Sequence, residues 1–243
     1  MSECNLLVFD FDDSLCTNDP EKIYYRWLQD LAGPEDVLPK KTFRDIVVYQ
    51  NEVFGFLYDK GKTTEDILKQ AEYKTLTPGM RELLTEARGN LNTKTIIVTD
   101  NNSVVLDHSI KYLGIHDLID KVISNPAHWN KEGRLVASPY CPQDHCDLSF
   151  SNLCKGDALW DYVKSLKEDH DVTVKTIGYV GDNKNDLCPS LRLREKDLIF
   201  PRATYPLVDF LHEKQADIKA GVRLWDSGRD ILRAWKERLA EEK

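Results

Sequence analysis

Short apolar segments recur along the chain and predict buried β-strands. They lie at residues 6–9, 95–98, 122–123, 176–180 and 198–200. Each is almost continuously apolar, which is typical of strands buried on both faces of a parallel sheet. Segments with helical periodicity, among them residues 104–113 and 155–166, lie between these strands. The alternation predicts an α/β fold with a Rossmann-like, doubly wound parallel sheet.

The same pattern predicts two insertions in this sheet. About eighty residues separate the first strand from the next, far more than a crossover connection needs. Apolar residues at helical spacing predict helices over residues 21–31, 41–54 and 64–71. We therefore expect residues 17–76 to form an all-helical cap, and residues 1–16 and 77–243 to form the core. A smaller insertion between residues 125 and 152 contains NKEGRLV, a glycine-bearing turn that predicts a β-hairpin.

Polar residues follow three of the predicted strands and open one predicted helix. They are Asp10, Asp12 and Ser14 after the first strand, Thr99 and Asp100 after the second, Lys155 at the helix start, and Asp182 and Asp186 after the fourth strand. Ligands of open α/β sheets bind beyond the carboxyl ends of the strands. We expect these residues to contribute to one site.

The acidic residues of this set suggest phosphoryl chemistry. Carboxylates a few ångströms apart raise one another's pKa, so they are stable mainly around a cation or a proton held for chemistry. Mg²⁺ prefers one or two carboxylates together with phosphate and water, which fits Asp10 and Asp182 as ligands. A carboxylate such as Asp10 can also attack phosphorus. Asp12, two residues on, points to the same side of the chain and could protonate the leaving oxygen.

Each motif alone has an ordinary structural explanation. The segment DFDDS can be a polar turn or a helix cap, Thr99 a capping residue, and Lys155 a solvated surface lysine. The segment GDNKND is also typical of a tight turn. The functional interpretation depends on their occurrence together, in one chain, each beyond a strand or at a helix start.

In this order the motifs resemble the four-motif signature of the haloacid dehalogenase (HAD) superfamily of phosphatases. The motifs are Asp10-x-Asp12-x-Ser14, Thr99, Lys155 and Gly181-Asp182-x-x-x-Asp186. The resemblance implies that Asp10 is the nucleophile and that Asp12 is the general acid/base, with a backbone contact to Mg²⁺. It further implies that Ser14, Thr99 and Lys155 bind phosphate, and that Asp182 and Asp186 serve the metal, Asp186 through water.

Three longer segments resemble one branch, the phosphoethanolamine/phosphocholine phosphatase (PHOSPHO) family, which includes pyridoxal-phosphate phosphatases. These segments are YVGDNKNDLCP, SNPAHW and HCDLSFSNLCKGDAL. The resemblance implies a Mg²⁺-dependent enzyme with a helical cap, acting on a small phosphorylated metabolite. It leaves the choice between phosphoethanolamine or phosphocholine and pyridoxal phosphate open.

A cationic head group such as ethanolamine or choline would need carboxylates or aromatic rings beside the phosphate site. The candidates are Asp100, Asp19 and Glu21, with Tyr24 or Tyr25 for a cation–π contact. Taken singly, each is explained as well by a solvated or helix-capping role. Pyridoxal phosphate would need a flatter pocket on which its ring can stack.

A cluster of cysteines departs from the branch pattern. That pattern runs C-x-x-C-P-x-N-x-C-K, and here Ser149 and Phe150 replace a cysteine and a proline. Zinc prefers four ligands in tetrahedral geometry, and Cys141, His145, Cys146 and Cys154 could supply them. Because adjacent residues such as His145 and Cys146 rarely both bind one ion, the sequence favours reduced thiols over a zinc site.

Composition narrows the class of protein. The formal net charge is −8, and no run of Lys or Arg is present, which disfavours binding to nucleic acid or to anionic membranes. The first residues have neither the basic region nor the uninterrupted apolar run of a signal peptide or an anchor. Six cysteines without a secretory signal favour reduced thiols and a cytoplasmic location. Nothing in the sequence indicates an oligomeric state.

Two other functions use the same motifs. A phospho-acceptor switch would bind Mg²⁺ and become phosphorylated without turnover, but it has no use for the base that Asp12 provides. A phosphotransferase or mutase of the same superfamily would keep the motifs and exclude water. The hypothesis that the residues favour is a Mg²⁺-dependent phosphomonoesterase with an aspartyl-phosphate intermediate on Asp10.

Overall fold

A six-stranded parallel sheet forms the centre of the computed structural model, which describes residues 2–17, 20–40 and 46–241. The strand order is β10-β9-β8-β1-β4-β5. The strands are β1 Ser2–Phe9, β4 Thr93–Asn102, β5 Lys121–Asn125, β8 Val172–Gly181, β9 Leu198–Pro201 and β10 Gly221–Val222. The predicted parallel α/β sheet is confirmed. Its sixth strand, β10, was not predicted because it has only two residues.

The chain winds outward from β1 in two directions. Strands β4 and β5 follow on one side of β1, and β8, β9 and β10 on the other. The strand order therefore reverses beside β1, which is where open α/β sheets bind ligands. Phe9 lies opposite Ile97 of β4 and Val180 of β8. The residues that follow these three positions therefore lie side by side at the same edge of the sheet.

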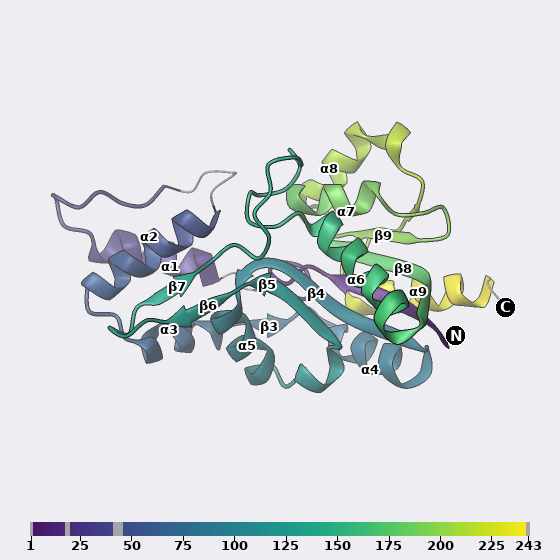
Figure 1. The fold of residues 1–243 in the computed structure, drawn as a ribbon, viewed down its shortest axis with the longest axis horizontal. Helices are drawn as coiled ribbons and strands as arrows, with labels where there is room; N and C mark the ends of the chain where they lie inside the picture. The colour runs from purple at the N-terminus through teal and green to yellow at the C-terminus, as the bar shows by residue number, and fades with distance from the viewer. Residues whose placement is uncertain (1, 18–19, 41–45, 242–243) are drawn as a thin grey trace.

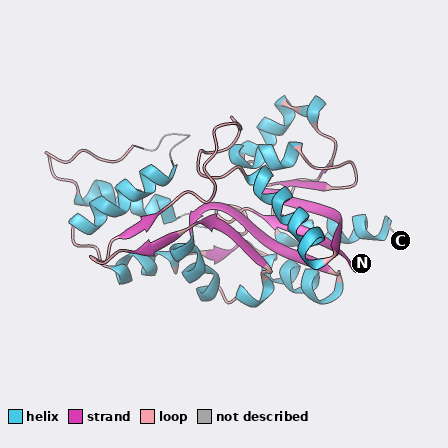
Figure 2. Ribbon diagram, viewed as in Figure 1, coloured by secondary structure: helices cyan, strands magenta, loops and turns pink. Residues whose placement is uncertain are grey.

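Helices cover both faces of the sheet (Figure 2). Leu7 and Phe9 of β1 pack with α4 (Met80–Asn90), α5 (Ser103–Tyr112) and α9 (Gly228–Glu241). Leu6 and Val8 point the other way and pack with α6 (Lys155–His170), α7 (Leu187–Leu191) and α8 (Pro206–Glu213). All four side chains are completely buried. Burial on both faces explains why the strand is continuously apolar.

A helical cap lies beside this core (Figure 1). Its helices are α1 Pro20–Leu31, α2 Ile46–Asp59 and α3 Thr64–Ala71. They lie between β2 (Cys16–Thr17) and β3 (Thr75–Leu76), an antiparallel pair that the sequence pattern did not predict. The first residues of the helix predicted over 41–54, residues 41–45, lie outside the described residues. The exact domain boundaries remain a prediction.

The hairpin predicted around NKEGRLV consists of β6 (Ala127–Trp129) and β7 (Leu135–Ala137), and it packs on the cap. Asn51 of α2 donates from Nδ2 to the carbonyl of Ala137 at 2.9 Å and accepts from its backbone N–H at 2.8 Å. Leu135 and Ala137 belong to the apolar cluster of the cap helices. The hairpin therefore packs against the cap helices and forms part of the cap.

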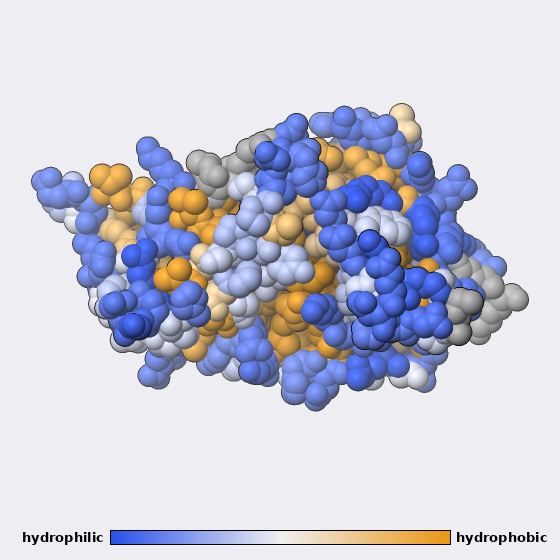
Figure 3. Space-filling model, in the orientation of Figure 1, coloured by the Kyte–Doolittle hydropathy of each residue, from blue (hydrophilic) through white to orange (hydrophobic). Residues whose placement is uncertain are grey.

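The surface is mostly polar on the face drawn in Figure 3, with apolar patches between the polar regions. Within the described ranges, no helix has both the length and the apolar composition that crossing a bilayer requires.

Candidate active site

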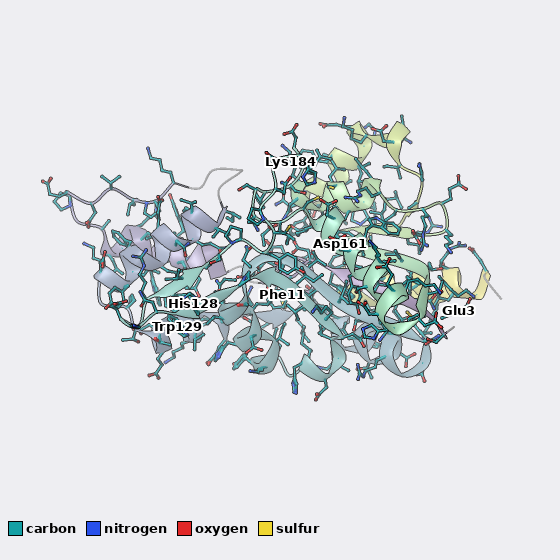
Figure 4. All side chains as sticks on the ribbon, in the orientation of Figure 1. Glu3, Phe11, His128, Trp129, Asp161 and Lys184 are labelled. Carbon is teal, nitrogen blue, oxygen red and sulfur yellow. The ribbon has the colours of Figure 1, made fainter. Side chains whose placement is uncertain are left out.

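The predicted site residues lie together at the carboxyl ends of three adjacent strands, β4, β1 and β8. Asp10 follows β1, Asp182 follows β8, and Thr99 lies near the end of β4. The backbone N–H of Asp10 donates to the carbonyl of Val180 at 2.9 Å. This bond fixes the backbone of Asp10 against β8. The neighbouring Phe11 lies near the centre of the molecule (Figure 4). The carboxyl ends of the central strands thus form the floor of a site beneath the cap.

Three buried carboxylates converge on this floor. Oxygens of Asp10, Asp182 and Asp186 lie within 4.8 Å of one another. Burial raises the pKa of Asp10 to about 7, although the nearby Lys155 opposes the shift. Burial and the charges of Asp10 and Asp186 raise the pKa of Asp182 to about 9. Burial is the largest cause of both pKa shifts, and the crowding of carboxylates that the sequence suggested adds to it.

Lys155 is the positive charge in this cluster. Its ammonium is completely buried and lies 2.9 Å from Asp10 Oδ1 and 2.8 Å from Asp186 Oδ1. Burial acts to lower the pKa of Lys155, and attraction to Asp10 and Asp186 outweighs it, so the pKa lies above its ordinary value. When all three carboxylates are ionised, they exceed the ammonium by two negative charges, which a divalent cation would balance.

Asp186 is held by four hydrogen bonds. Its Oδ1 accepts from Lys155 and, at 2.7 Å, from the hydroxyl of Tyr179. Its Oδ2 accepts from the backbone N–H groups of Asp182 at 3.0 Å and Asn183 at 3.1 Å. A carboxylate offers about four acceptor positions. Asp186 therefore positions Lys155 and the loop after β8. Tyr179 was not predicted, because its side chain lies within an otherwise apolar strand.

Gly181 allows Asp186 to approach the strand. A Cβ at this position would lie 2.7 Å from the Cβ of Asp186, closer than two such atoms pack. Glycine is therefore required between β8 and the acidic loop.

Ser14 and Thr99 are buried beside the acids. The Ser14 hydroxyl donates to Asp182 Oδ1 at 3.1 Å, and its carbonyl accepts from the Thr77 hydroxyl at 2.9 Å. The Thr99 hydroxyl accepts from the backbone N–H of Asn101 at 3.3 Å. The structure thus places Ser14 against a carboxylate, where it orients Asp182, and places Thr99 at the end of β4.

Asp12 lies apart from the three-carboxylate cluster and lines a pocket under the cap. Its carboxylate pairs with the ammonium of Lys74, which is completely buried and stacks over the Phe11 ring at 4.8 Å. The other oxygen accepts from Asn101 Nδ2 at 2.9 Å. Lys74 was not predicted because it lies at the end of the cap, far from Asp12 in the sequence. Asn101 directly follows the Thr99-Asp100 motif, and this adjacency could have identified it.

The pocket beside Asp12 has both polar and aromatic lining residues. It is lined by Asp12, Tyr24, Tyr49, Gln50, Val53, Phe54, Asn101 and Asn102. Tyr24, one of two predicted aromatic candidates, meets Phe54 edge to face at 5.4 Å. The other candidate, Tyr25, has 49% of its surface exposed and is not among the lining residues. The Oε1 atom of Gln50 is buried and has no hydrogen-bond partner in the described part of the chain.

Asp100 is the centre of a second polar network. Its carboxylate accepts from Asn152 Nδ2 at 2.8 Å and from Asn185 Nδ2 at 2.7 Å. Its carbonyl accepts from Asn125 Nδ2 at 2.8 Å and from Gln50 Nε2 at 3.3 Å. Burial raises the pKa of Asp100. The other two head-group candidates are not placed: Asp19 lies outside the described residues, and the side chain of Glu21 in α1 is not described.

Known proteins are similar to this chain in sequence, and solved structures are similar to it in fold. Residues 5–238 match the family described as "Putative Phosphatase". The human "Pyridoxal phosphate phosphatase PHOSPHO2" is 32% identical, covering 93% of this chain and 95% of the relative. The human "Phosphoethanolamine/phosphocholine phosphatase" is 30% identical over 93% of this chain and 86% of its own length. An "Inorganic pyrophosphatase 2" of Arabidopsis thaliana is also 30% identical, covering 97% of this chain and 84% of its own length.

Among solved structures, a "Phospho-Aspartyl Intermediate Analogue of Phosphoserine phosphatase" has the same fold. Its TM-score is 0.59 at 14% identity, over 96% of this chain and 99% of that structure. Sequence and fold agree with the resemblance inferred from the four motifs. The chain belongs to the Putative Phosphatase (PHOSPHO) family and is a phosphatase with the HAD fold.

Proposed function

We propose that the enzyme is a Mg²⁺-dependent phosphomonoesterase that forms an aspartyl-phosphate on Asp10 and hydrolyses a phosphoethanolamine-like metabolite. The contact of buried Lys155 with Asp10, 2.9 Å long, supports this most directly. In this contact the proposed nucleophile lies beside a cation that could bind phosphate, beneath the cap. An oxygen of Asp182 lies within 4.8 Å of one of Asp10, so the two carboxylates could share a metal ion.

The donor set fits Mg²⁺. Buried carboxylate oxygens are the hard ligands this ion prefers, and few are needed because phosphate and water would supply the other ligands. Asp10 and Asp182 would each hold it through one oxygen, and the backbone carbonyl of Asp12 is the third protein ligand that the family resemblance implies. Asp186, already saturated by hydrogen bonds, would contact it through water. When bound, the ion neutralises charge on the phosphoryl oxygens.

The chain's own residues account for the proton and phosphoryl transfers. Asp10 attacks phosphorus in line with the leaving oxygen, while Lys155 and Thr99 hold the phosphoryl oxygens. Asp12 donates a proton to the leaving oxygen and then takes one from the water that attacks the acyl phosphate. Lys74 and Asn101 hold the Asp12 carboxylate in place. Because Lys74 belongs to the cap, the position of the cap and that of the general acid are coupled.

The unpaired acceptor of Gln50 favours a substrate whose head group donates a hydrogen bond. Its buried Oε1 in the aromatic pocket would accept from the ammonium of phosphoethanolamine, whereas the trimethylammonium of phosphocholine has no N–H. Tyr24 and Phe54 would contact either cation through their rings. A second candidate is pyridoxal phosphate, favoured by the aromatic lining and by the name of the 32% identical relative.

Replacing Asp10 tests the nucleophile. Asp10→Asn should lower turnover of p-nitrophenyl phosphate at least about 1,000-fold, because an amide does not attack phosphorus. Asp13→Asn is the matched control, since it changes the same group three residues on and should keep near-parental turnover. Parental activity in Asp10→Asn would contradict the proposal. A single burst of product without further turnover by the unchanged enzyme would instead indicate a phospho-acceptor switch.

Replacing Lys74 tests the positioning of Asp12. Lys74→Met should lower kcat about 10–100-fold for an alkyl phosphate and much less for p-nitrophenyl phosphate, whose leaving group needs no proton. The Asp12→Asn variant should show the same dependence on leaving group. The control, Lys69→Met, removes an exposed lysine of α3 and should change neither rate. An equal loss for both substrates would mean that Lys74 serves folding alone.

Metal removal should make stability depend on pH. A raised carboxyl pKa means that the folded, metal-free protein keeps protons that the unfolded chain releases above about pH 4. With EDTA, Tm should therefore fall as pH rises through the pKa values of about 7 for Asp10 and about 9 for Asp182. Mg²⁺ should raise Tm more at about pH 8.5 than at about pH 6, because it replaces those protons.

Asp182→Asn is the control for the metal experiment and should lose most of the Mg²⁺ effect. An increase in Tm that is independent of pH, or that survives in Asp182→Asn, would place the ion elsewhere.

A substrate panel tests the head group. The enzyme should prefer phosphoethanolamine to phosphocholine in kcat/KM, and Gln50→Leu should remove the preference by losing the acceptor. Gln29→Leu, at an exposed position of α1, should keep it. Pyridoxal phosphate and pyrophosphate complete the panel. A higher kcat/KM for either of these would assign the same mechanism to a different substrate.

A further inference from the structure

Three thiols converge behind the active site. The sulfurs of Cys146, Cys154 and Cys188 lie within 4.8 Å of one another. Cys188 was not expected in this group, because it lies on α7 and is distant from the other two in sequence. Cys141, which was expected, is exposed and stands outside the group among the described residues.

The distances fit thiols around an ion better than a disulfide. Cys154 Sγ and Cys188 Sγ are 3.5 Å apart, whereas a disulfide bond is about 2.05 Å long. Two thiolates that bind one Zn²⁺ at about 2.3 Å in tetrahedral geometry are about 3.8 Å apart. The third thiol, Cys146, has its Sγ 3.5 Å from the hydroxyl of Ser149. Small side-chain movements would therefore bring all three sulfurs into contact with one ion.

The burial of the three thiols also fits a metal site. Cys154 and Cys188 are buried, and Cys146 is partly exposed, so solvent reaches the group from one side. An ion could enter there, and a water molecule could occupy the fourth position. His145 is a weaker candidate for that position, because its Nε2 is already bonded to Asp157 at 2.7 Å.

We propose that Cys146, Cys154 and Cys188 form a binding site for a thiophilic divalent cation of the Zn²⁺ class. Each thiol loses its proton to solvent as a sulfur–metal bond forms, and no electron is transferred. Thiolates favour such a soft cation over Mg²⁺, so this site and the carboxylate site would select different metals.

The position of the thiols gives the ion a structural role. Cys154 directly precedes Lys155, and Cys188 follows Asp186 by two residues. Cys146 belongs to the long connection between β7 and α6. The ion would fasten that connection to the two segments that carry Lys155 and Asp186. It would thereby rigidify the phosphate-binding side of the active site without touching substrate.

Cobalt substitution tests the proposal directly. The reduced, full-length enzyme, with Mg²⁺ in excess to occupy the carboxylates, is titrated with Co²⁺. We expect one equivalent to produce a thiolate-to-cobalt charge-transfer band and tetrahedral d–d bands, and Zn²⁺ to abolish both. A cobalt spectrum without charge transfer, or no binding, would contradict the proposal. This titration of the unchanged enzyme decides the question even if a cysteine variant fails to fold.

Cysteine variants identify the ligands. Cys188→Ser and Cys146→Ser should each weaken Co²⁺ binding at least about 100-fold, since loss of a ligand should cost no less than loss of its supporting contacts. Cys141→Ser, in the same connection but outside the group, should bind Co²⁺ as the unchanged enzyme does. An unaltered spectrum in Cys188→Ser, or a weakened one in Cys141→Ser, would contradict the assignment.

Discussion

The buried ammonium of Lys155 is the interaction on which the site depends. It contacts Asp10 and Asp186, and all three groups are almost completely removed from water. An isolated buried charge is very unfavourable, and a buried pair is tolerated only with good geometry and further hydrogen bonds. Tyr179 and two backbone N–H groups supply those bonds to Asp186. The fold thus holds the proposed nucleophile Asp10, the ammonium of Lys155 and the loop proposed to bind the metal in fixed relative positions before any ligand arrives.

Two polar contacts join the cap to this arrangement. Lys74, just before β3, pairs with Asp12, and Gln50 of α2 donates to the carbonyl of Asp100. Neither contact is made by the residues that would touch phosphorus. A displacement of the cap would therefore disturb Asp12, the proposed general acid, and the proposed substrate pocket, while leaving Asp10 and Lys155 unchanged. This division is consistent with a family that keeps one reaction and varies its substrate.

Much of the core could be predicted from sequence, because its signals are local. The strands were found from continuous apolar runs, and Asp10, Asp182 and Asp186 from their positions after those runs. The partners of these residues could not be found in this way. Tyr179 lies inside a strand, and Lys74 reaches Asp12 only because β2 and β3 pair at the base of the cap. Cys188 similarly joins Cys154 through the packing of α7 on α6, which no spacing along the chain reveals.

In the proposed mechanism, Asp10 is phosphorylated while Asp10 and Asp182 share one divalent cation. A crystal structure of the enzyme grown with Mg²⁺ and beryllofluoride, a mimic of an acyl phosphate, tests it most directly. We expect beryllofluoride attached to a carboxylate oxygen of Asp10, in contact with Lys155, and a single Mg²⁺ bound by Asp10 and Asp182. Beryllofluoride on another residue, or Mg²⁺ bound away from Asp182, would contradict it.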